Sequence, residues 1–116
     1  MYAAVRGAIQ DSVNGKSIVL IHISHSYKAG ASLYFSYIFE MDTGAESEQW
    51  KRIKQSASNA IRDFDGTISH HHGVGIDHRA WMDAEKGTLG MSVLKATKDT
   101  LDPSGMMNPG KLLSGD

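Results

Sequence analysis

Cysteine is absent from this 116-residue sequence. A disulfide framework, a thiolate metal site and a cysteine nucleophile are therefore excluded. Proline is almost as rare: Pro103 and Pro109 are the only two, both near the C-terminal end, and no proline-rich linker divides the chain. No stretch approaches the ~20 apolar residues that a membrane span needs, and the N-terminus lacks a signal-peptide pattern. We expect one soluble, cytoplasmic domain over residues 1–116.

An excess of charge of one sign is also missing, because 12 Lys and Arg face 13 Asp and Glu for a net charge of -1. Nucleic-acid-binding domains usually carry a basic patch, so that class is not expected. The hydrophobic fraction of 41% is ordinary for a soluble globular protein. Charge alone does not indicate the partner.

The first part of the chain predicts a helix and two strands. Apolar side chains recur at helical spacing in residues 2–9, and Asn14 with Gly15 supplies a turn signal after them. Residues 17–25 and 31–41 are rich in β-branched and aromatic residues, which is typical of strands. We expect the two strands to pair as a hairpin with a long loop.

The next stretch predicts a second helix. Thr43 and Glu46 have the spacing of a capping box, and apolar side chains then recur at threes and fours until Asp65 and Gly66. Residues 67–69 are expected to form a third strand.

The remaining stretch predicts a loop and further helices. The loop covers residues 70–75, and Asp77 is expected to cap the helical region behind it. The order of elements predicts an α+β fold in which helices cover one face of an antiparallel sheet.

Histidine is frequent, with six residues, and His70, His71 and His72 are consecutive. On an extended backbone alternate side chains point to opposite faces, so His70 and His72 share a face and His71 points away. All three converge only if the backbone bends, and Gly73 and Gly75 permit a bend.

The triplet by itself leaves three interpretations open. Histidines in a polar loop are often exposed or bonded to the backbone. Neighbouring imidazoles can also divide proton donation and acceptance near neutral pH, which suits acid/base work on a substrate. Neutral imidazole is a common zinc ligand, and His22, His25 and the triplet supply enough nitrogens for a metal site.

Tyr34 lies in the second predicted strand. The usual role of a strand tyrosine is packing, with the hydroxyl reaching a partner or water. A phenol acts as a general acid or base near neutral pH only beside a base or a cation. The use of Tyr34 therefore depends on whether it faces a histidine.

Three stretches, taken in order, resemble one family. They are residues 22–35, residues 66–75 with the histidine triplet followed by Gly-Val-Gly, and residues 101–113 with the run Asn-Pro-Gly-Lys. They resemble the C-terminal region of alkyldihydroxyacetonephosphate synthases and of related bacterial FAD-linked oxidases. The triplet is the most specific part, whereas many FAD-linked oxidases of the D-lactate dehydrogenase kind share the ending.

The resemblance implies a ferredoxin-like cap domain over residues 1–116, which covers the substrate at the isoalloxazine ring of FAD. An FAD-binding domain outside this chain would hold most of the cofactor. The implied reaction exchanges the acyl group of acyl-dihydroxyacetonephosphate for a fatty alcohol in ether-lipid synthesis. On its own the chain is expected to be inactive and to self-associate through the face that meets the FAD-binding domain.

The same resemblance assigns roles to individual residues. Tyr34 matches the active-site tyrosine that handles a proton, and His70, His71 and His72 match histidines beside the flavin and the substrate head group. Asn108 matches a position that contacts the cofactor.

Two alternative functions stay open. The same cap can serve an FAD-linked 2-hydroxy acid oxidase or dehydrogenase of the D-lactate or glycolate type. Some of those relatives bind zinc at strand positions near His22 and Tyr34 and at the middle of the triplet, His71, although they usually have glutamate at that middle position. The third possibility is a stand-alone histidine-rich metal-binding module, which stoichiometric zinc would stabilise against heat.

Overall fold

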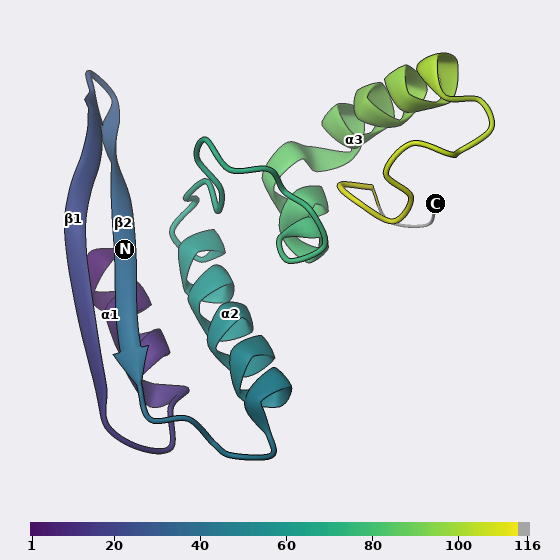
Figure 1. The fold of residues 1–116 in the computed structure, drawn as a ribbon. Helices are drawn as coiled ribbons and strands as arrows, with labels where there is room; N and C mark the ends of the chain where they lie inside the picture. The colour runs from purple at the N-terminus through teal and green to yellow at the C-terminus, as the bar shows by residue number, and fades with distance from the viewer. Residues whose placement is uncertain (114–116) are drawn as a thin grey trace. The chain divides into compact units, whose positions relative to one another are not determined.

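A computed structural model describes residues 1–113 and divides the chain into two compact units (Figure 1). The N-terminal unit is Met1–Gly66 and the C-terminal unit is Thr67–Asp116. The expected single domain over residues 1–116 stays a prediction. Within residues 1–113, the helices are all too short or too polar to span a membrane.

The N-terminal unit contains the four elements that the sequence predicts. Helix α1 covers Tyr2–Asp11, strand β1 covers Ser17–Tyr27, strand β2 covers Gly30–Phe39 and helix α2 covers Glu46–Arg62. The two strands pair antiparallel as expected. The expected long hairpin loop is wrong, because only Lys28 and Ala29 lie between the strands.

The two faces of the hairpin differ in burial. One face packs against both helices, where Val5 and Ile9 of α1, Val19 of β1 and Ile53 of α2 form a buried core with Val13. On the other face, apolar side chains of β1 and β2 are exposed, among them Ile18, Leu20 and Ile38. The predicted α+β fold, with helices on one face of an antiparallel sheet, is therefore confirmed.

Helix α2 begins differently from the prediction. Ala45 occupies the cap position and no side chain caps the helix, so the expected capping box of Thr43 and Glu46 is wrong. Gly44 has a φ of 88°, which turns the chain immediately before the helix. Its N–H donates to the carboxylate of Glu46 at 3.0 Å, and this bond lowers the pKa of Glu46.

A buried amide joins α2 to the end of the hairpin. Gln49 is 1% exposed, its Nε2 donates to the carbonyl of Glu40 at 2.8 Å, and its Oε1 accepts the N–H of Asp42 at 3.0 Å. Arg52 continues the network by donating to the carbonyl of Ser12 at 2.7 Å. The bonds of Gln49 satisfy two backbone groups in the segment that leaves β2, and the bond of Arg52 satisfies one at the end of α1.

We expect Gln49→Leu to lower the free energy of unfolding of the N-terminal unit by about 1–3 kcal/mol, because two backbone groups lose their partner. Urea denaturation followed by circular dichroism measures this. Gln55→Leu, the same change at an exposed position of α2, is the control and should stay within about 0.5 kcal/mol of wild type. Equal losses in both variants would show that the buried amide contributes nothing specific.

The C-terminal unit contains a short 3-10 helix, η1, over Arg79–Trp81, and helix α3 over Met82–Leu101, which is broken at Gly87 by a φ of 68°. The expected third strand over residues 67–69 is wrong, because the described part of this unit, residues 67–113, contains no strand. The backbone N–H of Ile68 instead donates to the carboxylate of Glu85 at 3.2 Å. The expected cap at Asp77 is also wrong, since Asp77 lies in a turn and His78 precedes η1.

Candidate functional site

Tyr34 and His22 form a pair on the exposed face of the hairpin. They are opposite each other in the strand register, and their rings stack with centroids 5.1 Å apart and planes at 28°. Tyr34 is 46% exposed. The phenol therefore has an imidazole beside it and remains reachable from solvent, although its catalytic role stays a prediction.

An irregularity in β1 creates this pair. The register shifts between Ile23 and His25, so that one residue of β1 has no partner in β2. Continued without the shift, the register near the turn would place Ile23, and not His22, opposite Tyr34. A bulge of this kind re-aims side chains and is common beside functional sites.

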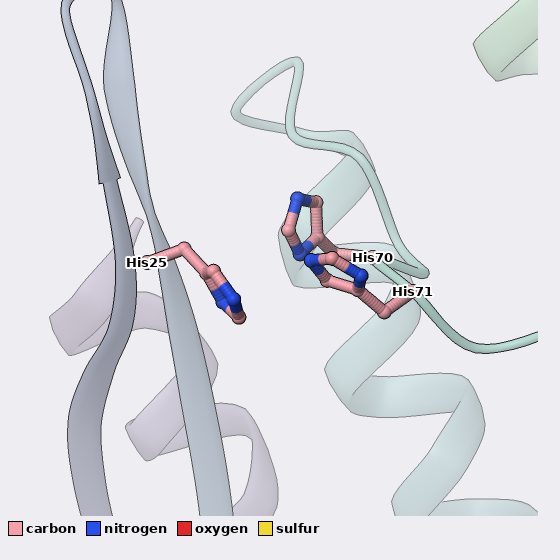
Figure 2. A group of neighbouring side chains, drawn as sticks. All are labelled: His25, His70 and His71. Atoms are coloured by element: carbon pink, nitrogen blue, oxygen red, sulfur yellow. The ribbon is translucent and has the colours of Figure 1, made fainter.

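The histidine triplet is bent at its centre. His71 has a φ of 65°, and its ring meets that of His70 edge to face with centroids 4.0 Å apart (Figure 2). The hydroxyl of Ser69 donates to the carbonyl of His72 at 2.8 Å and closes the bend. The bend thus brings together two neighbours, His70 and His71, that an extended backbone would separate.

The other residues considered for a metal site lie on separate elements. His25 extends from β1 (Figure 2), and its ring stacks on Tyr27 with centroids 6.4 Å apart. His22 belongs to the N-terminal unit and His71 to the C-terminal unit. The ligand set of the metal alternative therefore stays a prediction.

Asn108 lies in a loop that is tied down by polar contacts. Its φ is 48°, a left-handed conformation that asparagine tolerates better than most residues. Its carbonyl accepts the N–H of Lys111 at 3.2 Å. Further along, the guanidinium of Arg79 donates to the carbonyl of Gly110 at 2.6 Å, and the N–H of Leu112 donates to the carbonyl of Gly75 at 3.2 Å.

An ion pair at the start of this loop was not singled out from the sequence. Lys98, in the last turn of α3, donates to the carboxylate of Asp102, and the side chains are only 20% and 8% exposed. The bond from Lys98 lowers the pKa of Asp102, as do the N–H groups of Met107 and Met106. The spacing of four residues at a helix end was the available signal, but Asp102 was interpreted as a turn residue.

Comparison with known proteins identifies relatives of the chain. A model of the family "FAD linked oxidases, C-terminal domain" matches residues 1–112. Alkyldihydroxyacetonephosphate synthase of Dictyostelium discoideum is 34% identical over 82% of the chain, and that of Trypanosoma brucei brucei is 34% identical over 86%. A mitochondrial D-lactate dehydrogenase (cytochrome) of Arabidopsis thaliana is 26% identical over 87%.

The chain spans 16% of the length of each of the two synthases and 18% of the dehydrogenase. The matched region nevertheless includes the first two stretches that carried the resemblance in the sequence and all of the third except its last residue. Because the family model covers nearly the whole chain, the chain belongs to the family of FAD linked oxidases and corresponds to its C-terminal domain.

Proposed function

We propose that this chain is the substrate-covering cap of an FAD-dependent enzyme that exchanges the acyl group of acyl-dihydroxyacetonephosphate for a fatty alcohol. The contact between Tyr34 and His22 on the exposed face of the hairpin carries the proposal. The similarity to two alkyldihydroxyacetonephosphate synthases supports this reaction class.

The family implies FAD as the cofactor, and the groups on this chain fit it. When bound, FAD supplies the isoalloxazine ring at which the substrate reacts. Its pyrimidine edge alternates N–H and C=O groups, and a carboxamide both donates and accepts hydrogen bonds. Asn108 presents such a group from an exposed position in a loop with fixed backbone, so we propose that it contacts the flavin.

The remaining site residues have two proposed roles, proton transfer and binding of the substrate head group. Tyr34 takes up a proton from the substrate while its own hydroxyl proton passes to His22, and the reverse transfer restores both groups. His70, His71 and His72 donate N–H groups to the phosphate of the substrate, since hydrogen bonds to an ionised phosphate are stronger than those between neutral groups. The edge-to-face contact of His70 and His71 limits how far their rings can rotate.

The apolar side chains on the same face of the hairpin as Tyr34 fit the covered surface of a cap. Ile18, Leu20 and Ile38 are all more than half exposed on the same face. Exposed apolar patches of this kind mark interaction surfaces. We propose that the FAD-binding domain and the lipid substrate cover this face, and that the isolated chain self-associates through it.

The longest natural polypeptide that contains this chain provides the test. Its visible absorption spectrum should be that of bound oxidised flavin. With acyl-dihydroxyacetonephosphate and a fatty alcohol it should release fatty acid and form the ether product while the flavin stays oxidised. A protein without flavin would refute the proposal.

A redox reaction is the second candidate, because a D-lactate dehydrogenase is also similar to the chain. In that case a 2-hydroxy acid would bleach the flavin under anaerobic conditions, and no exchange product would form. Substrate-dependent bleaching therefore distinguishes the two candidates in one cuvette.

A further inference from the structure

Directly before Asn108, the loop is not anchored by apolar side chains. Met106 and Met107, the two residues before Asn108, are 77% and 66% exposed. A loop whose large side chains lie in solvent gains little stabilisation from burial. Polar contacts must therefore fix the conformation of the loop before Asn108.

Lys98 and Asp102 provide those contacts. The carboxylate of Asp102 accepts the N–H of Met106 at 3.0 Å and the N–H of Met107 at 2.8 Å. The ammonium of Lys98 donates to the same carboxylate and, at 2.8 Å, to the carbonyl of Met107. Both backbone polar groups of Met107 are thus bound by one ion pair, directly before Asn108.

The left-handed conformation of Asn108 adds to the need for an anchor. Residues in sparsely populated backbone regions persist when the surrounding structure over-determines them. The bonds to Met107 fix the chain before Asn108, and the bond from Arg79 to Gly110 fixes it afterwards. Charged hydrogen bonds between poorly exposed groups are among the stronger ones available for this purpose.

From these contacts we infer that Lys98 and Asp102 are positioning residues, which hold Asn108 in the orientation that contacts the flavin. The inference rests on the proposed function, because it takes the flavin as the ligand of Asn108. Neither Lys98 nor Asp102 touches the cofactor in this scheme; they act through the backbone of Met107.

The same helix offers a matched control. Lys95 and Asp99 have the same spacing of four residues and bond at 2.9 Å, but their side chains are 60% and 57% exposed. Exposed pairs of this kind contribute little to stability. Lys95→Met therefore removes the same group from the same helix away from the loop.

The test measures FAD affinity in the longest natural polypeptide that contains the chain. We expect Lys98→Met to raise the dissociation constant of FAD about tenfold and to alter the fine structure of the flavin absorption band, because the carbonyl of Met107, directly before Asn108, loses its donor. Lys95→Met should change the constant less than about twofold. Lys98→Arg, which restores the charge, should recover most of the affinity.

A double-mutant cycle separates positioning from general stabilisation. If Lys98 acts through Asn108, Lys98→Met combined with Asn108→Ala should bind FAD no worse than Asn108→Ala alone, since interacting residues are not additive. Additive losses, or equal constants for Lys98→Met and Lys95→Met, overturn the inference. Asp102→Asn, which keeps an oxygen acceptor without the charge, gives a second route to the same comparison if Lys98→Met folds poorly.

The outcome also distinguishes this inference from the proposed function. A wild-type protein that binds no flavin refutes both. A wild-type protein that binds flavin, with variants that bind it equally well, refutes only the positioning role.

Discussion

Tyr34→Phe is expected to lower kcat for the acyl-to-alkyl exchange by about 10²- to 10⁴-fold, the range that a positioned proton-transfer group contributes. Phenylalanine keeps the ring that stacks on His22 but removes the hydroxyl. Flavin content and the visible spectrum should therefore match those of wild type. The rate at which the longest natural polypeptide containing this chain forms the ether product at saturating substrate measures kcat directly.

Tyr27→Phe is the control for this substitution. Tyr27 lies on the same hairpin, is exposed and stacks on a histidine, His25, with planes at 10°. Tyr27→Phe removes the same hydroxyl oxygen from similar surroundings, and we expect kcat to stay within about twofold of wild type. If Tyr34→Phe retained full activity, Tyr34 would be a packing residue and proton transfer would have to be assigned elsewhere.

The contact on which this prediction rests was only partly accessible from the sequence. Alternation of side chains predicts which residues of each strand share a face. It does not predict that His22 opposes Tyr34, because that depends on a two-residue turn and on the register shift between Ile23 and His25. A slip of one residue exchanges the faces of a strand, and a bulge leaves no reliable composition signal.

Two other differences have similar physical causes. The sequence predicted that Gly73 and Gly75 permit the bend, because glycine tolerates left-handed backbone best. Gly75 is indeed left-handed, with a φ of 59°, but His71 within the triplet is left-handed as well. Residues 67–69 were expected to pair in a sheet, but a distant side chain, Glu85, accepts the N–H of Ile68 instead. A bond of this kind, from a backbone N–H to a side chain distant in the sequence, depends on tertiary structure. Local sequence patterns therefore cannot predict it.

Local patterns predicted the rest of the N-terminal unit well. The two helices and the hairpin follow from apolar spacing and from β-branched composition. The same spacing placed Ile53 on the apolar face of α2, where it is 0% exposed against Val5, Ile9 and Val19. This residue should be the most sensitive position of the core.

Ile53→Ala is expected to lower the free energy of unfolding of the N-terminal unit by about 2–5 kcal/mol, because it removes buried methyl groups and leaves a cavity. Trp50 lies in α2 and Trp81 in η1, so Trp50 fluorescence in a Trp81→Phe background reports this unit during urea denaturation. Ile38→Ala removes the same atoms from a side chain that is 67% exposed and should cost less than about 1 kcal/mol.

Equal losses for Ile53→Ala and Ile38→Ala would show that the buried core contributes no more to stability than the exposed face of the hairpin. A much larger loss for Ile53→Ala would show that the buried core stabilises the strands, while the exposed face contributes little to stability. Val19 packs in the same core as Ile53, and it lies in β1, the strand that also carries His22. The packing of Ile53 therefore holds β1 in place. We expect Ile53→Ala to weaken the contact between His22 and Tyr34, although it changes neither residue.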